Sequence, residues 1–415
     1  MADVNQPPAS PTCSPDRALW ISTVAFTLCF AVWTLFAIIG IRIKQELGLS
    51  EAEFGLLVGT PVLTGSLIRI LLGVWTGRYG GRLVYTATML AAALATFLLS
   101  RATTYPEMLI AGLGVGLAGG SFAVGVAYVS PFFPPEKQGT ALGIFGAGNV
   151  GAAVTKFLAP FVLLAWGWQA VAEIWALALA VMAVVFWFTT GDDPDYRKRK
   201  LQGGAPKPFL QEFAPLRNAR VWRFSLYYFF AFGGFVALSL WLPRYLVGAY
   251  GFDIETAGMI ATAYSIPGSI FRAYGGVLSD RIGARAVMYL VFLVSAVATA
   301  ILALPPTPPF AIGPIVFVAV VFVLGFVMSL GKAAVFKHIA AYYPESIGAV
   351  GGVVGMVGGL GGFLLPVAFG VLKDLTGLWS SCFLLLLLVI AVSLCWMHRT
   401  VRHLRLSPAP AEASA

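Results

Sequence analysis

Long apolar stretches, separated by short polar turns, follow one another along almost the whole chain. A helix needs about 20 mainly apolar residues to cross the roughly 30 Å hydrocarbon core of a bilayer. Twelve stretches come close to that length, and only the polar interruption between the sixth and the seventh is long. The pattern predicts an all-α membrane protein with twelve transmembrane helices. We expect them at Leu19–Ile41, Phe54–Trp75, Val84–Ser100, Met108–Phe132, Gly139–Leu164, Trp168–Phe188, Val221–Leu246, Thr256–Leu278, Ala286–Leu304, Phe310–Phe336, Ile347–Leu372 and Trp379–Met397.

The second half of the chain repeats features of the first half at a constant offset of 203 residues. The matching pairs are Ser66 and Ser269, Arg69 and Arg272, Gly73 and Gly276, Val74 and Val277, Arg78 and Arg281, Gly80 and Gly283, and Arg82 and Arg285. The repeat predicts two pseudo-symmetric halves of six helices each. The expected organisation is a disordered tail at 1–18, an N-terminal half at 19–190, a polar linker at 191–220, a C-terminal half at 221–398 and a second tail at 399–415.

The composition agrees with a membrane protein and excludes several other classes. Hydrophobic residues make up 59% of the chain and charged residues 11%. In soluble domains hydrophobic residues make up about 45–50% and charged residues about 25%. The four cysteines and three histidines are scattered and have no metal-ligand spacing. A membrane enzyme needs a cluster of such groups, together with acidic residues, around a cavity. We therefore expect no enzyme, no metal and no cofactor.

The lysines and arginines predict the orientation of the chain, because they collect on the cytoplasmic side of a membrane protein. With both termini cytoplasmic, 17 of the 27 basic residues lie on that side, 5 on the other and 5 within helices. The net charge of +9 is then a topology signal, and nucleic acid is not an expected partner. We expect a multi-pass protein of the cytoplasmic (inner) membrane, and a monomer.

Two arginines stand deep inside predicted helices, at matched positions of the repeat. An arginine at the bilayer centre costs about 2.5–3.5 kcal/mol on insertion scales, unless it reaches the interface or lines a polar cavity. The next turn after Arg69 and after Arg272 has its own basic residues for the interface, which favours the cavity. Glu173, near the outer end of the sixth helix, is too distant to neutralise either one. The pair therefore indicates a small anionic ligand at the junction of the two halves.

Other residues leave two readings open at this stage. Asn149 is a mid-helix amide between glycines, suited either to contacts between helices or to a hydrogen bond with a ligand. Tyr228 and Phe232 share one helix face, as packing residues or as ligand contacts. Small-residue faces let membrane helices approach and slide, which alternating access requires. The glycines that we assign to this role are Gly143, Gly148, Gly151, Gly351, Gly355 and Gly358.

Several motifs give the chain a family resemblance. The segments 73–82 and 276–285 resemble the loop motif of the major facilitator superfamily, although Gly77 replaces an aspartate that the second copy keeps as Asp280. Helices four, five and eleven resemble the nitrate signatures of the nitrate/nitrite porter family within that superfamily. The segments that carry this likeness are Gly119-Gly120-Ser121-Phe122, Phe132-Phe133-Pro134, Gln138-Gly139-Thr140-Ala141-Leu142-Gly143, Gly146-Ala147-Gly148-Asn149-Val150-Gly151 and Gly358-Gly359-Leu360-Gly361-Gly362-Phe363-Leu364-Leu365-Pro366.

The resemblance implies a secondary active transporter that imports nitrate by alternating access. It implies that Arg69 and Arg272 clamp the anion, and that Phe122, Tyr228 and Phe232 pack around it with Asn149 nearby. Two positions depart from the family pattern: Gly359 and Ser121 each stand where an asparagine is expected.

The segment Gly331–His338 resembles the proton-coupled subgroup of the family, so the sequence favours nitrate/proton symport. Lys156 and Lys332 are then the candidate proton carriers, with Glu173 and His338 as outer and inner relays. An equally open reading of Lys156 is that its ammonium reaches the outer interface. Nitrate/nitrite antiport is the alternative mechanism, because it cancels the cost of moving an anion against an inside-negative potential. A carrier of another small anion is the less favoured alternative.

Overall fold

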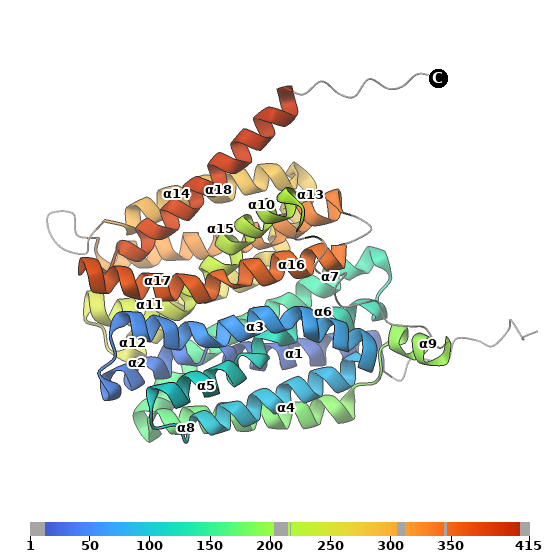
Figure 1. Ribbon diagram of the computed structural model, residues 1–415, viewed down its shortest axis with the longest axis horizontal. Helices are drawn as coiled ribbons and strands as arrows, with labels where there is room; N and C mark the ends of the chain where they lie inside the picture. The colour runs from blue at the N-terminus through green and yellow to red at the C-terminus, as the bar shows by residue number, and fades with distance from the viewer. Residues whose placement is uncertain (1–12, 203–214, 216, 305–311, 344–346, 407–415) are drawn as a thin grey trace, which may run out of the picture.

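The computed structural model describes residues 13–202, 215, 217–304, 312–343 and 347–406. The predicted N-terminal tail up to residue 12, residues 203–214 and 216 of the linker, and the C-terminal tail from residue 407 lie outside these residues. Every regular element in the described part of the chain is helical. Figure 1 shows two groups of helices side by side, α1–α8 below and α10–α18 above.

The first half comprises the elements up to α8, and α9 (Pro194–Gln202) follows it. Its elements are α1 (Pro15–Trp33), α2 (Phe36–Leu47), α3 (Glu51–Tyr79), α4 (Gly81–Leu99), α5 (Tyr105–Val115), α6 (Leu117–Val129), η1 (Ser130–Phe132), α7 (Pro135–Gly146), η2 (Ala147–Val150) and α8 (Gly151–Thr189). The second half contains α10 (Ala219–Tyr228), the π-helical η4 (Phe229–Gly234), α11 (Phe235–Tyr250), α12 (Ile254–Ile270), α13 (Arg272–Ile282), α14 (Ala284–Leu302), α15 (Pro314–Tyr342), α16 (Ile347–Gly359), α17 (Gly361–Thr376) and α18 (Ser381–Leu406).

Ten stretches in the described part of the chain are long and apolar enough to cross a membrane. One of them, Thr140–Thr189, holds two of the twelve predicted helices, because the backbone of Gly167 is non-helical and divides α8. The pair α12 and α13 is not among the ten, because a break at Phe271 leaves each piece shorter than 18 residues. If Thr140–Thr189 is counted as two helices and the α12–α13 pair is added, the ten stretches become the twelve helices that the sequence predicts.

The internal repeat is visible in the helix boundaries. Helix α3 covers 51–79 and the pair α12–α13 covers 254–282, at the same offset of 203. Helix α4 and helix α14 are both 19 residues long and also match at this offset. Gly80 and Gly283 precede them with φ angles of 88° and 85°, a conformation that glycine adopts without steric cost. The two halves are thus built on one plan.

The first and last helices extend beyond their predicted ends. Helix α1 begins at Pro15 because the Ser14 side chain accepts a hydrogen bond from the backbone N–H of Arg17, and proline suits the first turn. Helix α18 continues to Leu406, past the predicted end at Met397. Hydropathy marks only the apolar part of a helix, so the polar turns at both ends escape it.

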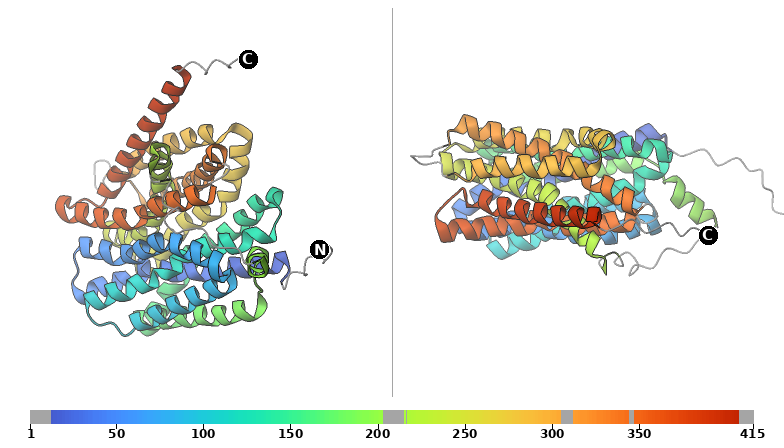
Figure 2. Two further views of the ribbon diagram at one scale, coloured as in Figure 1. Left: turned by 45° about the vertical axis from the view of Figure 1, so that its right-hand side comes forward. Right: turned by 90° about the horizontal axis from the view of Figure 1, so that it is seen from above.

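The two halves touch most closely at the end of the bundle opposite the chain termini, here called the far end. In Figure 2 the start of α1 and the end of α18 lie at the other end, here called the termini end. A methyl group added to Gly55 or Gly370 would overlap the carbonyl of Pro366 or of Glu51 in the other half. A methyl group on Gly258 would likewise overlap the carbonyl of Lys156. Only glycine permits these backbone contacts.

Toward the termini end the contact between the halves becomes less close. A methyl group on Gly59 would stand 3.0 Å from the carbonyl oxygen of Phe363. Further along, one on Gly355 would be 3.9 Å from the Arg69 guanidinium, and one on Gly352 would meet nothing within 4 Å. The structure is therefore tightly closed at the far end and looser at the termini end.

Charged groups reinforce the far-end closure. The Glu51 carboxylate accepts hydrogen bonds from Arg244 of the other half, one of them 3.2 Å from Nε, and Lys44 is 3.6 Å away. Asp374 accepts from the backbone N–H groups of Glu51 (3.2 Å) and Ala52 (2.8 Å) at the start of α3. A carboxylate at a helix N-terminus also interacts favourably with the helix dipole. These contacts join α3 to α11 and α17.

At the termini end the two copies of the loop motif are held differently. Asp280 of the second copy forms an ion pair with Lys337, at 2.5 Å. The first copy has Gly77 at the matching position, and there Asp193 accepts a hydrogen bond from the Gly81 backbone N–H at 3.1 Å. Burial raises the pKa of the Asp193 carboxyl. A linker carboxylate thus holds the loop that lacks its own aspartate.

Candidate functional site

Arg69 and Arg272 meet in the middle of the bundle, one from each half. Their guanidinium carbons lie 5.9 Å and 5.4 Å from the centre of the same ring, that of Phe122. The repeat therefore brings the two predicted cations to a common site. Phe122 lies beside both of them.

Arg69 is almost completely buried, with 5% of its surface exposed. One terminal nitrogen donates a hydrogen bond to the Gly355 carbonyl at 3.2 Å, and its buried Nε has no partner. Its guanidinium also lies 5.1 Å from the Phe232 ring and 5.8 Å from the Trp33 ring. The aromatic rings stabilise the cation but leave donor capacity unused, so the group can still bind an anion.

Arg272 is positioned by the break in the α12–α13 pair. Phe271 leaves the helical conformation, and Arg272 is the first residue of α13. Pro267 within α12 lacks an N–H, which weakens the helix near this point. The half-buried guanidinium lies 5.7 Å from the Phe336 ring. Arg69 instead stands within the continuous helix α3, so the two arginines are held by different backbones.

The predicted aromatic residues belong to one cluster around the arginines. The rings of Tyr228 and Phe232 are stacked, with centres 5.1 Å apart and an angle of 11°. Phe336 lies edge-on to Tyr228 at 5.3 Å. Phe232 lies within the π-helical turn η4, and such turns are frequent at functional sites. Sequence reasoning missed Trp33 and Phe336, because neither stands in a charged or repeated position.

Two lysines are fully buried in the bundle, and one of them, Lys332, lies 5.9 Å from the Phe232 ring of this cluster. Lys332 is fully buried, donates to the Gly268 carbonyl at 2.7 Å, and lies 3.1 Å from the centre of the Phe235 ring. Lys156 is also fully buried, and its ammonium donates to the hydroxyls of Ser239 (2.5 Å) and Ser265 (2.9 Å) of the other half. The ammonium of Lys156 therefore does not reach the outer interface.

None of these four cations has a carboxylate partner within the described residues. The ion pairs found there join Arg42 to Glu46, Lys44 and Arg244 to Glu51, Arg101 to Glu173, and Lys337 to Asp280. Hydroxyls, carbonyls and aromatic rings surround the central cations instead. An uncompensated buried charge is strongly unfavourable, so the arrangement calls for an anion.

Further polar groups at the site are unpartnered. Asn149 is 1% exposed in η2, and its buried amide nitrogen has no hydrogen-bond partner among the described residues. The same is true of the Ser66 hydroxyl, one turn before Arg69. A methyl group on Gly359 would stand 2.6 Å from that hydroxyl and 3.5 Å from the Arg69 guanidinium. An asparagine at 359 would therefore enter the site, whereas glycine leaves room there.

The six glycines assigned to helix movement occupy different surroundings. Gly148 and Gly151 pack against α1, where a methyl group would meet the carbonyls of Thr23 and Thr27. The others lie on α7 and α16: Gly351 against Phe336, Gly355 beside Arg69, Gly358 against Tyr228, and Gly143 with nothing within 4 Å. Gly355 and Gly358 therefore border the candidate site directly.

The two predicted relays lie away from the arginine pair. Glu173 pairs with Arg101 at 3.2 Å and accepts from the Ser100 hydroxyl, and 42% of its side chain is exposed. His338 stacks on Phe224 at 5.5 Å near the termini end. Neither is linked to Lys156 or Lys332 by a hydrogen bond within the described residues.

Comparison with known proteins identifies similar chains. A model of the Major Facilitator Superfamily matches residues 21–259 and 245–414. The chain is 44% identical to the "Probable nitrate/nitrite antiporter NarK1" of Thermus thermophilus, over 93% of this chain and 92% of the relative. It is 35% identical to the "Probable nitrate/nitrite transporter NarK2" of Mycobacterium tuberculosis (96% and 97% covered) and 30% identical to the "Nitrite extrusion protein" of Bacillus subtilis (93% and 96%).

Solved structures with low sequence identity share the fold. A bacterial homologue of the lysosomal transporter Spinster, in an inward-facing and unoccupied conformation, superposes with a TM-score of 0.74 at 17% identity, covering 95% of this chain and 99% of that one. A mutant form of the nucleoside transporter NupG gives 0.71 at 17% identity, covering 92% and 99%.

Proposed function

The chain belongs to the nitrate/nitrite transporters of the major facilitator superfamily, and from that premise we propose that it exchanges nitrate for nitrite by alternating access. It is a membrane transporter and not an enzyme. In this proposal Arg69 and Arg272 hold one planar anion between them, and Phe122, Tyr228 and Phe232 surround it. The amide of Asn149 and the hydroxyl of Ser66 supply further hydrogen bonds.

The observation that carries the proposal is the pair of central guanidiniums without a carboxylate partner in the described residues. An arginine does not lose its proton in a protein, so these charges persist through the transport cycle. Closing the halves around an empty site would bury two repelling cations. An anion removes that repulsion, so the loaded site changes sides far more readily than the empty one. A site of this kind favours exchange of one anion for another.

We propose that the termini end faces the cytoplasm, because the larger share of lysine and arginine lies there. The structure would then represent the state open toward the cytoplasm, since the halves are closed at the far end. Exchange of two monovalent anions moves no net charge. Nitrate uptake is then independent of the membrane potential, which otherwise opposes entry by about 2.3 kcal/mol per 100 mV.

Proton symport is the second candidate, and Lys332 favours it. A proton-coupled carrier needs a buried group that can lose its proton, and burial beside a second cation disfavours a charged lysine. Lys332 has one carbonyl partner and two aromatic rings around its ammonium, and Arg272 is nearby. Lys156 has two hydroxyl partners and is the weaker candidate for this role.

Transport in proteoliposomes distinguishes the two mechanisms. Labelled nitrate is offered to vesicles that contain nitrite, nitrate or neither, with and without an inward proton gradient. Exchange predicts rapid uptake only when an anion is inside, with no response to the gradient. Accumulation in anion-free vesicles, abolished by a protonophore, would replace exchange with symport. If nitrate does not inhibit the uptake of any labelled anion, nitrate is not a substrate and both mechanisms are rejected.

A further inference from the structure

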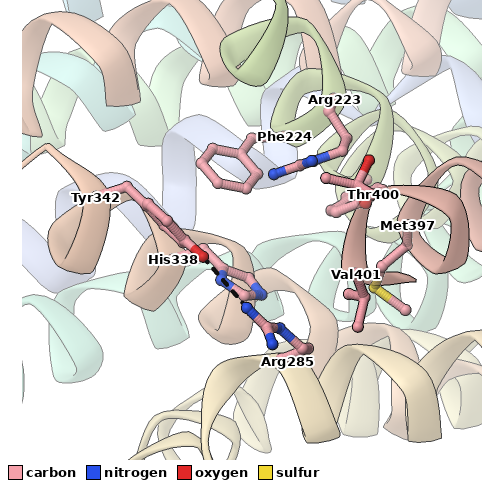
Figure 3. Close-up of a pocket in the computed structure, with 9 residues that line it drawn as sticks. Arg223, Phe224, Arg285, His338, Tyr342, Met397, Thr400 and Val401 are labelled. Carbon is pink, nitrogen blue, oxygen red and sulfur yellow. Dashed lines mark hydrogen bonds between the residues drawn. The ribbon is translucent and has the colours of Figure 1, made fainter. Parts of the chain in front are cut away.

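A second group of cations lies at the termini end of the C-terminal half, separate from the central site and without an ion-pair partner in the described part of the chain. Figure 3 shows a cavity that Arg223 of α10 and Arg285 of α14 enter from different helices, with His338 and Tyr342 of α15 beside them. Residues of α18 line its remaining side. The cavity is lined by Arg223, Phe224, Tyr227, Arg285, His338, Tyr342, Met397, Thr400 and Val401.

The polar groups of the cavity are mostly hydrogen-bond donors without acceptors. Arg285 donates to the Tyr342 hydroxyl across 3.4 Å, and Arg223 lies 5.4 Å from its neighbouring Phe224 ring. Neither arginine has a carboxylate partner within the described residues. The Nε2 atom of His338 and the hydroxyl of Tyr227 are buried and have no hydrogen-bond partner there either. Such a set of donors matches an oxyanion.

The size and place of the cavity narrow the choice of oxyanion. The cavity has about 20 Å³ of space for the centre of a water-sized molecule and is partly open, so it admits one small group at its mouth and not a whole organic ligand. A second hollow, lined by Tyr289, His398, Val401 and Arg402, adjoins it through Val401. Two more nitrogen-bearing side chains thus continue the basic lining along α14 and α18, at the level where these helices leave the apolar part of the bundle.

We propose that this cavity binds a phosphate group between Arg223 and Arg285. Each guanidinium can donate two parallel hydrogen bonds to phosphate oxygens, and the Tyr227 hydroxyl and His338 imidazole can donate others. The group is either the phosphodiester of a phospholipid, whose glycerol part would occupy the adjoining hollow, or free inorganic phosphate. The site belongs to the C-terminal half alone, so it does not depend on which anion is transported.

Native mass spectrometry and thermal unfolding of the purified full chain test the site. Phosphatidylglycerol and inorganic phosphate are titrated in separate arms, which identify the source of the group. Each arginine is expected to contribute about tenfold to affinity, so R223Q/R285Q should bind about 100-fold more weakly. The control R281Q/R399Q removes the same charge from exposed positions outside the cavity and should bind within about twofold of the wild type.

Nitrate binding at the central arginines serves as the folding control, and it should be unchanged in both double variants. Binding of phosphatidylglycerol or of phosphate that is lost only in R223Q/R285Q supports the proposal. Equal binding by the two double variants, or by the wild type and R223Q/R285Q, overturns it. The acidic residue nearest to Tyr342 in sequence is Glu345, three residues later, which lies outside the described residues. A double-mutant cycle, measured by thermal unfolding, that shows an interaction between Arg285 and Glu345 would also overturn the proposal. The Glu345 carboxylate would then be the anion that Arg285 binds.

Discussion

Replacing Arg69 with lysine keeps the positive charge of the central site and removes the fork of donors. The guanidinium donates one hydrogen bond to the Gly355 carbonyl, and its Nε has no hydrogen-bond partner among the described residues. We propose that its free donors bind two oxygens of the planar anion. The lysine ammonium is a point charge on a flexible stem and cannot reproduce two parallel bonds.

The loss is about one charge-assisted hydrogen bond, or about 1.5–3 kcal/mol. At 25 °C this weakens nitrate binding by about 10- to 150-fold. Arg272→Lys should have an effect of the same size, because both guanidiniums lie beside the same Phe122 ring. Arg42→Lys is the matched control, since Arg42 is exposed and paired with Glu46 at the far end.

Ligand-dependent unfolding measures this change in a purified protein. Nitrate at 100 times its dissociation constant stabilises the wild type by about 2.7 kcal/mol. At that concentration a variant that binds 100-fold more weakly gains only about 0.4 kcal/mol. Equal stabilisation of Arg69→Lys and of the wild type would refute the two-point clamp, whatever the transport rate. If Arg42→Lys also lost the effect, the change would reflect a general consequence of replacing arginine with lysine and not the clamp.

Three other changes test different parts of the mechanism. Lys332→Gln should leave nitrate/nitrite exchange intact; a variant that loses proton-driven accumulation but keeps exchange would instead establish symport through this lysine. Gly355→Leu should reduce nitrate exchange at least tenfold, because the new side chain would start 3.9 Å from the Arg69 guanidinium; normal exchange rates in vesicles would mean that this face points away from the site. Glu51→Gln should weaken the far-end closure and lower the half-saturating nitrate concentration on that side of sealed vesicles, and an unchanged value would show that the Arg244 and Lys44 contacts of this carboxylate do not set the balance.

Much of the fold could be read from the sequence, because bilayer thickness fixes helix length and the repeat fixes correspondence between the halves. Both copies of the arginine motif lie in the site, and the Gly80 and Gly283 backbones match closely. The break at Phe271 could not be read in this way, since the hydropathy of that helix gives no sign of it. Hydropathy also does not show where the polar end of a helix stops, as at Leu406 in α18.

The site could be predicted only where chemistry was unusual. A buried arginine is rare enough to notice, whereas Trp33 and Phe336 are ordinary membrane residues until the fold brings them to a guanidinium. The far-end contact of Glu51 with Arg244 joins residues 193 positions apart and has no counterpart in local sequence. Contacts of that kind depend on how the halves meet, which no periodicity encodes.

The closed far end has a consequence for how the protein meets anions on its two sides. If the closed state is favoured by about 2 kcal/mol, only about 3% of molecules expose the site at the far end at any moment. An anion arriving from that side then encounters an apparent dissociation constant raised about 30-fold, although the binding groups are identical. One pair of arginines can thus serve as a weak receptor on one face of the membrane and a strong one on the other. In this proposal sidedness is set by the contacts that Arg244 and Asp374 make with the start of α3, whereas Ser66 and Arg69 lie near the middle of the same helix.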